Sequence, residues 1–298
     1  MFILTGCFWV TTPFHTYLQE NLNFAHFMRS ALIIAIIALS VASCSKFSRV
    51  QKSTDYDYKL RMAEKYYVAK KYNYASQLYE ELFPIMKGQP QFEDLFYKYA
   101  YCSYYLHDWL QAENLFKQFV EVFPTSAKAE EMEYMRAFTY YRQSPKAELD
   151  QTNTQKTIGL MQTFINTHPN SPRNKEASDI MDKCRIKLEE KEVGSAQLYY
   201  NMSHYRAAAI AYTSLMADFP DSPKGDTYKL QVIKSYYLFA MNSIEDKKPA
   251  RFEQVVSECH DFLDRFPEST LKKEVENYET LAKNNIKATN NEQITKTN

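Results

Sequence analysis

The sequence predicts an all-α protein, an α-solenoid in which about five helix pairs stack on one another. The first observation behind this prediction is composition: the 298 residues include only 5 Gly but 24 Tyr and 19 Phe, which suits helices with much buried aromatic surface. The second is a turn that recurs along the chain, and the third is a set of alanines at a fixed spacing. Self-similarity at a fixed period is the signature of a repeat array.

Four amphipathic stretches end in the same kind of turn. In each turn a ring-bearing residue precedes Pro, and Ser follows Pro by two positions, at residues 123–126, 168–171, 219–222 and 266–269. Pro terminates a helix because it lacks a backbone N–H, and the Ser beyond it is suited to cap the next helix. His168 stands where the other three turns have Phe, and we therefore predict that it packs in the turn.

Small residues recur at fixed offsets upstream of these turns. Ala63, Ala100 and Ala137 are 37 residues apart, and Ala75 and Ala112 follow the first two by 12. An aromatic residue comes four positions after each member of the second set. The other members of the pattern are Tyr79, Phe116, Ala196, Tyr199, Ala208, Tyr212 and Pro220.

This pattern resembles the tetratricopeptide repeat, in which small residues let two antiparallel helices approach and an aromatic ring fills the space one turn on. One pair cannot bury its apolar face alone, so neighbouring pairs stack. The pattern is weaker in the third and fifth pairs, where Thr157 and Val255 occupy the second small position. We expect pairs at 55–87, 93–124, 130–169, 189–220 and 227–267, a polar insertion at 143–155, a helix running from Arg173 into the fourth pair, and a last helix over 272–283.

An apolar run near the N-terminus resembles the signal peptide of a bacterial lipoprotein. Arg29 precedes the apolar residues 31–41, and a Val-Ala-Ser-Cys sequence ends at Cys44. The resemblance implies cleavage before Cys44 and acylation of its thiol and new amine, which would give a stable membrane anchor. It also implies that Ser45, a residue other than Asp, favours the outer membrane. The alternative is an uncleaved membrane anchor with a chance cysteine.

These features suggest how the chain is organised. We expect Met28 to be the true start, so that residues 1–27 are a mis-assigned upstream extension and 28–43 are the signal peptide. Residues 44–54 would form a lipidated linker. The repeats would fall into an amino-terminal set, 55–170, and a carboxy-terminal set, 171–283. The polar residues 284–298 lack aromatic side chains and are expected to be a disordered tail.

Several function classes are disfavoured by composition and motifs. Lys+Arg and Asp+Glu both number 36, which argues against nucleic-acid binding through bulk charge. No two Gly lie close enough for a phosphate-binding loop, and no two His have the helical spacing of a metal pair. The isolated Cys102, Cys184 and Cys259 are predicted to be small core residues. We therefore expect no catalytic residues, no metal and no cofactor other than the covalent lipid on Cys44.

Tyrosines on the first helices of the pairs are the candidate ligand-binding residues. In a tetratricopeptide array these helices line the concave groove. Tyr offers a large contact area at low entropic cost, with a hydroxyl for the backbone of a bound peptide. The alternative is that some of these rings only brace the helix pairs. The expected groove residues are Tyr67, Tyr97, Tyr101, Tyr104, Tyr105, Tyr134, Tyr141 and Arg142.

A lipobox-like Cys44 followed by five repeats is similar to the BamD-type lipoproteins of the outer-membrane β-barrel assembly machinery. The stretches that carry the resemblance are 134–137 (YMRA), 196–200 (AQLYY), 217–222 (ADFPDS) and the insertion in the third repeat. The resemblance implies a non-catalytic scaffold on the periplasmic face of the outer membrane. Its amino-terminal repeats would bind nascent outer-membrane proteins, and its carboxy-terminal repeats would bind a BamA-type insertase, with other Bam components as further partners.

One segment departs from the family, and two other functions stay open. Residues 207–211 (AAAIA) replace a more polar stretch, so the insertase contacts cannot be carried over residue by residue. One alternative is another tetratricopeptide lipoprotein, such as a pilotin for secretin or pilus assembly. The other is a helical periplasmic enzyme, which would need two carboxylates facing each other across a cleft.

Overall fold

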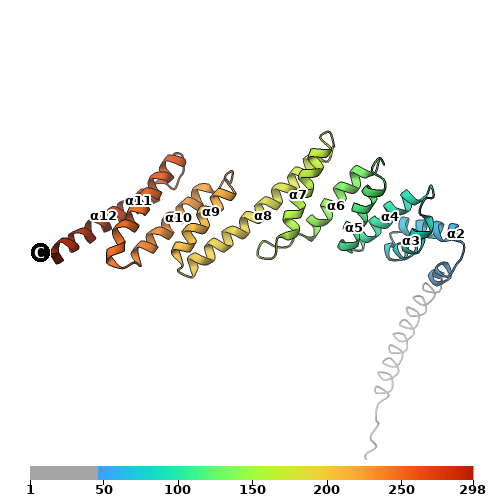
Figure 1. The fold of residues 1–298 in the computed structure, drawn as a ribbon, viewed down its shortest axis with the longest axis horizontal. Coiled ribbons are helices and arrows are strands. Elements are labelled where there is room, and N and C mark those ends of the chain that lie inside the picture. The colour runs from blue at the N-terminus through green and yellow to red at the C-terminus, as the bar shows by residue number, and fades with distance from the viewer. Residues whose placement is uncertain (1–45, 298) are drawn as a thin grey trace, which may run out of the picture. The chain divides into compact units, whose positions relative to one another are not determined.

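The computed structural model describes residues 46–297, and every regular element in that range is a helix (Figure 1). This confirms the all-α solenoid of helix pairs. The predicted signal peptide and Cys44 lie outside the described residues. The described residues divide into two compact units, 46–119 and 120–297. No helix within 46–297 combines the length and the apolar character needed to cross a bilayer.

The first unit contains the first helix pair and most of the second. Helical residues 46–51 precede α2 (Tyr56–Val68), α3 (Tyr72–Met86), α4 (Phe92–Tyr105) and α5 (Trp109–Val122). The predicted contact alanines are all fully buried, as are the aromatic residues expected one turn after the second alanine of each pair. These residues are Ala63, Ala75, Ala100, Ala112, Tyr79 and Phe116. Their burial confirms the predicted repeat register.

The second unit continues the same arrangement. Its elements are α6 (Ala129–Gln143), α7 (Thr152–Thr167), α8 (Asn174–Asn201), α9 (Tyr205–Asp218), α10 (Gly225–Met241), the short 3-10 helix η1 (Glu245–Lys247), α11 (Lys248–Arg265) and α12 (Lys272–Thr297). The 28-residue α8 packs against both α7 and α9, as expected for a helix that runs from Arg173 into the fourth pair. Its Ala196 is fully buried in a core cluster with Ala209 and Tyr212.

In the two weaker repeats a larger residue at the small position is accompanied by a smaller residue at the aromatic position, so the packing is kept. Where Val255 replaces the small residue, the position one turn later holds Cys259 in place of an aromatic ring, and both are fully buried. In the third repeat Thr157 is followed in the same way by Met161. Because cores tolerate substitutions that conserve total volume, these departures preserve the helix contact.

The serine of each recurrent turn caps the turn and not the helix. Its hydroxyl accepts a hydrogen bond from the backbone N–H two residues on, at 3.0–3.2 Å, in Ser126, Ser171, Ser222 and Ser269. The next helix begins three residues after the serine, at Asn174 and Gly225 for example, and the N-cap residues Arg173 and Lys224 make no side-chain cap hydrogen bond. The predicted role as helix cap is therefore wrong. These residues make local turns because a short hydroxyl side chain reaches the N–H two positions away.

The hydroxyls of Ser171, Ser222 and Ser269 also donate to an acidic residue on the first helix of a pair. Ser171 donates to Glu130 at 2.5 Å and Ser269 to Asp226 at 2.7 Å, while Ser222 donates to Glu189. Each bond joins the end of one repeat to the start of its own first helix. The turn is thereby fixed to the body of the repeat.

The carboxy-terminal end differs from the prediction. Helix α12 extends to Thr297, so the residues expected to form a disordered tail are helical. The extension has a packing reason, because Ala282 is fully buried and Ile286 packs on the same core cluster, which also contains Phe252 and Phe262. Beyond residue 283 the helix therefore keeps one apolar contact with the core, made by Ile286, within an otherwise polar sequence.

The polar insertion of the third repeat is an ordered loop. Gln151 is 4% exposed, and its side-chain amide donates to the carbonyl oxygens of Lys146, Ala147 and Leu149. From α8, Lys187 donates to Ser144 Oγ and Lys191 to the Leu149 carbonyl oxygen, both at 2.7 Å. The loop is therefore held from inside by an amide and from outside by two ammonium groups.

Candidate peptide-binding surface

Tyrosines of α2, α3 and α4 form one connected set of rings in the first unit. We call this the tyrosine cluster: Tyr67, Tyr72, Tyr97, Tyr101, Tyr104 and Tyr105. Tyr72 stacks on Tyr105 with ring centroids 4.4 Å apart, and Tyr67 meets Tyr72 at 5.8 Å. Along α4, Tyr101 contacts Tyr97 at 4.8 Å and Tyr105 at 5.9 Å. All five tyrosines that the sequence predicted in this unit therefore belong to one contiguous cluster.

The members of the cluster differ in exposure. Tyr105 is 44% exposed at the end of α4, while Tyr101 is only 7% exposed and touches the buried Phe116 of α5 at 5.6 Å. Tyr101 therefore braces the helix pair, as the alternative interpretation allowed. Tyr72 is not among the expected groove residues, because it begins α3, the second helix of its pair, and only tyrosines on first helices were expected in the groove.

A polar group adjoins the tyrosine cluster. Tyr79 donates its hydroxyl proton to Glu64 Oε1 at 3.1 Å, and Lys98 bridges Glu64 to Asp94. Burial, and then the charge of Glu64, raises the pKa of Tyr79, and burial likewise raises the pKa of Tyr67. Both phenols stay protonated at neutral pH, so their hydroxyls remain hydrogen-bond donors.

The other three predicted groove residues lie in the second unit, on α6. Tyr134 is 2% exposed, with its ring 5.6 Å from that of Phe164 and the Arg173 guanidinium 4.9 Å from its centroid. Tyr134 is therefore a core residue, and its expected place on the groove surface is wrong. Tyr141 is half-buried, and Arg142 is exposed in the last turn of α6.

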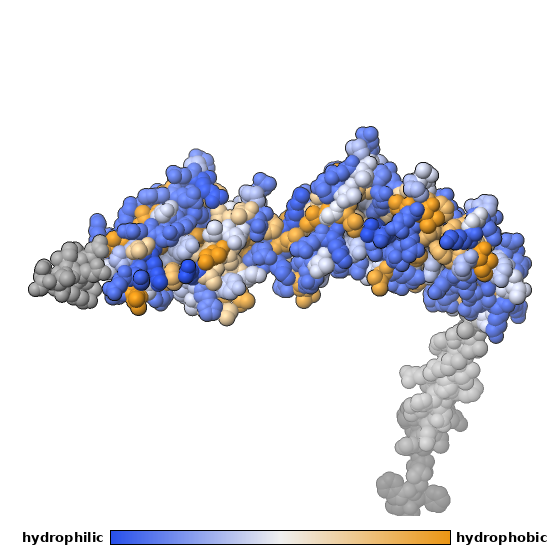
Figure 2. Space-filling view, in the orientation of Figure 1, coloured by the Kyte–Doolittle hydropathy of each residue, from blue (hydrophilic) through white to orange (hydrophobic). Residues whose placement is uncertain are grey.

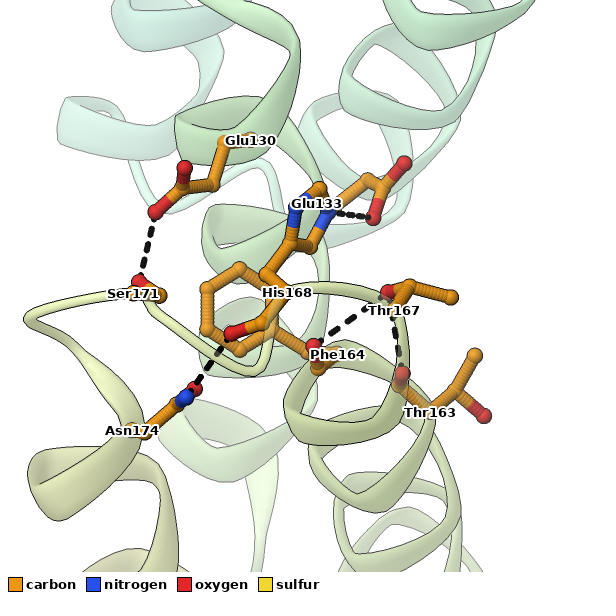
Figure 3. A network of polar contacts seen from close by, with 8 residues as sticks. All are labelled: Glu130, Glu133, Thr163, Phe164, Thr167, His168, Ser171 and Asn174. Carbon is orange, nitrogen blue, oxygen red and sulfur yellow. Dashed lines mark hydrogen bonds and ion pairs between the residues drawn. The ribbon is translucent and has the colours of Figure 1, made fainter.

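His168 has the predicted packing role and also makes polar contacts. Its ring lies 5.1 Å from that of Phe164, and Nε2 is 2.8 Å from Glu133 Oε2 on α6 (Figure 3). The His168 carbonyl oxygen accepts from the Asn174 side chain at 2.8 Å. The imidazole thus replaces the Phe of the sister turns and gains a bond across the repeat.

Within residues 46–297 no cluster of His, Cys, Asp and Glu has the geometry of a metal site. Cys102, Cys184 and Cys259 are buried free thiols. Burial raises the pKa of Cys102 and of Cys259 to about 12, so neither is a thiolate at neutral pH. These three cysteines act as small core residues, as predicted.

Comparison with known proteins places this architecture in a family. Residues 58–251 match the family model described as "YfiO: Outer membrane lipoprotein". The chain belongs to this family. It is also similar to the outer membrane protein assembly factor BamD of Pasteurella multocida, with 21% identity over 238 residues, which cover 76% of this chain and 90% of that protein.

Solved structures with related helix arrangements have low similarity. The TPR2AB domain of yeast Sti1, in a complex with pHSP90, has a TM-score of 0.34 at 14% identity and covers 76% of this chain and 98% of that one. The Thermus thermophilus TPR protein TTC0263 has a TM-score of 0.30 at 14% identity, with the same coverage of 76% and 98%. With TM-scores this low, neither bears on function.

Proposed function

We propose that this protein is a non-catalytic scaffold lipoprotein of the outer-membrane β-barrel assembly machinery. The observation that carries the proposal is the family membership over residues 58–251, supported by the similarity to an assembly factor. In this role Cys44 carries the lipid, the first repeats bind nascent outer-membrane proteins, and the later repeats bind a BamA-type insertase. No cofactor takes part.

The tyrosine cluster is the proposed contact for the nascent chain. Stacked rings such as Tyr72 and Tyr105 offer a flat apolar surface on which an aromatic residue at the end of an extended peptide can stack. Their phenol hydroxyls can bond with the peptide backbone. Such a site would recognise one aromatic side chain and an extended backbone, so it would bind peptides of many different sequences.

The test replaces both rings of the stacked pair. The variant Tyr72→Ala with Tyr105→Ala should bind a carboxy-terminal peptide of an outer-membrane β-barrel protein about thirtyfold more weakly, since each of the two aromatic contacts contributes about 1 kcal/mol. Binding is measured by fluorescence anisotropy with a labelled peptide that ends in Phe. Tyr199→Ala is the matched control, because Tyr199 is also 44% exposed but lies on α8. Equal affinity of the double variant, at an unchanged melting temperature, would remove the peptide site.

Exposed apolar side chains of the second unit are the proposed contact for the insertase. They gather at the end of α8, on α9 and at the end of α10, where Figure 2 shows pale and orange residues over α9 and α10. A pocket of about 470 Å³ beside them is lined by His204, Tyr205, Arg206, Ile210 and Phe239. The exposed residues are Leu198, Tyr199, Met202, Ile210, Met241 and Ile244. Apolar surface of this kind marks protein interaction sites.

A charge introduced at this surface tests the insertase contact. Ile210→Lys should abolish co-purification of the insertase from membranes, because an ammonium group would be buried without a partner. Ile186→Lys is the control, since Ile186 is 52% exposed against 51% for Ile210 and lies on the first half of α8. Capture of a secretin in place of the insertase by the unaltered protein would identify the chain as a pilotin-like factor.

A further inference from the structure

A basic cavity lies at the start of the first unit, between helical residues 46–51, α2 and α3. It has a volume of about 490 Å³, and four cationic side chains line it: Lys46, Arg49, Lys65 and Lys71. None of its lining residues is Asp or Glu. Since the whole chain has equal numbers of basic and acidic residues, this is a local concentration of positive charge.

The four cations are not neutralised within the described chain. None of them has a carboxylate partner among residues 46–297, although buried or half-buried lysines nearby are paired, such as Lys59 with Glu81 at 2.7 Å. All four are exposed. Like charges around one cavity repel each other, and an anion placed between them converts that repulsion into attraction.

Aromatic packing fixes the wall that carries two of these cations. Phe47 stacks on Tyr74 with centroids 4.4 Å apart and meets Tyr66 at 5.8 Å, while Val50 is 2% exposed. With Phe47 and Val50 buried on one helix face, Lys46 and Arg49 share the neighbouring face, because residues three apart lie side by side. The two cations therefore line the cavity from a segment anchored to α2 and α3.

Tyrosines supply neutral hydrogen-bond donors between the charges. Tyr58, Tyr66 and Tyr74 also line the cavity. Partial burial, together with the neighbouring Tyr58 and Tyr74, raises the pKa of Tyr66, so its phenol stays protonated. Ammonium, guanidinium and phenol groups around a volume of this size form a donor set that suits the oxygens of a phosphate.

We infer that this cavity binds the phosphate group of an anionic membrane lipid. Lys46 follows Cys44 by two residues, so a lipid on Cys44 would hold the cavity at the depth of the headgroups. The placement of the cavity at the headgroups rests on the proposed lipid anchor, whereas the binding of phosphate by the cavity does not. Free phosphate shares the headgroup's chemistry, and adding it separately distinguishes the two sources.

The experiment is native mass spectrometry of the purified protein in a neutral detergent. Phosphatidylglycerol, or diacylglycerol with the same acyl chains, is added to the unaltered protein and to Lys65→Gln with Lys71→Gln. The unaltered protein should retain phosphatidylglycerol and not diacylglycerol, and the variant should bind about thirtyfold more weakly, since each of the two basic residues adds about 1 kcal/mol. Lys175→Gln with Lys183→Gln, two exposed positions on α8, is the control and should bind as the unaltered protein does.

Three outcomes would overturn the inference. The first is retention of diacylglycerol equal to that of phosphatidylglycerol. The second is unchanged lipid binding by the Lys65 and Lys71 variant when its circular dichroism spectrum is also unchanged. The third is displacement of the lipid by an equal concentration of inorganic phosphate. The last would assign the cavity to a soluble phosphate. Failure of the anchor proposal is read separately, from the mass of Cys44 and from membrane fractionation, and leaves the detergent measurement intact.

Discussion

Single buried polar residues fix the ends of the repeats. Glu189 on α8 is 9% exposed, and it accepts a hydrogen bond from Tyr228 at 2.7 Å and another from Ser222 in the turn. A buried carboxylate is costly unless its oxygens are bonded, so these two hydroxyls decide whether Glu189 stabilises the repeat.

The variant Ser222→Ala should lower the free energy of unfolding by about 1–3 kcal/mol, because it removes one bond to a charged acceptor and one turn bond. Urea unfolding followed by circular dichroism measures this. Ser214→Ala on the exposed face of α9 is the control and should unfold as the unaltered protein does. A loss no larger than that of the control would show that Tyr228 alone satisfies Glu189.

Buried thiols and phenols make the fold sensitive to alkaline pH. Burial raises the pKa of Cys102 and Cys259 from 9.0, and that of Tyr99 from 10.0, to about 12. These groups are neutral when protonated, so the folded state keeps its protons at a pH where the unfolded chain has lost them. Their contribution to stability is complete below about pH 9 and is lost as the pH rises toward 12.

The urea midpoint should therefore be constant near pH 8 and fall steadily above about pH 9. Replacing Cys259 by Ala should make that fall shallower, because one ionising group is removed. The measurement compares urea midpoints of the two proteins at a series of alkaline pH values. A midpoint that is flat up to pH 11 would contradict the burial of these groups.

At the scale of the helix, close approach depends on small side chains. Ala208 of α9 is fully buried at its contact position, whereas Ala217 on the same helix is exposed. Two helices can lie near each other only where such residues leave room, and larger side chains force backbone shifts.

The variant Ala208→Leu should lower the free energy of unfolding by about 1–3 kcal/mol through overpacking. Ala217→Leu adds the same atoms in solvent and should change stability little. Thermal unfolding of both variants checks this pair. Equal melting temperatures would count against the register of the fourth repeat.

At the scale of the whole molecule, the proposed lipid on Cys44 determines where the repeats work. Cys44→Ala should move the protein from the membrane fraction to the soluble fraction and abolish the mass added by acylation, because acyl chains supply the apolar surface for anchoring. Cys102→Ala, a change at a buried thiol, should leave fractionation unchanged. Membrane retention of Cys44→Ala would favour the uncleaved anchor.

The repeat architecture and its register can be predicted from the sequence alone. Alanines such as Ala63 and Ala208 recur at fixed offsets because helix contact requires them, so a spacing pattern is enough to predict the pairs. The same spacing pattern locates the Pro-containing turns. It also shows that Thr157 and Val255 occupy positions that hold a small residue in the other repeats.

Which tyrosines face outward, and where basic side chains lie close together, depends on contacts between helices and could not be predicted. Tyr101 and Tyr134 fit the groove pattern but are buried by Phe116 and Phe164, which come from other helices. The basic cavity joins residues 46–50 to α2 and α3, and the helical residues beyond 283 depend on packing against α11. The physical reason is that burial is set by side chains arriving from other elements, which a period along one helix does not encode.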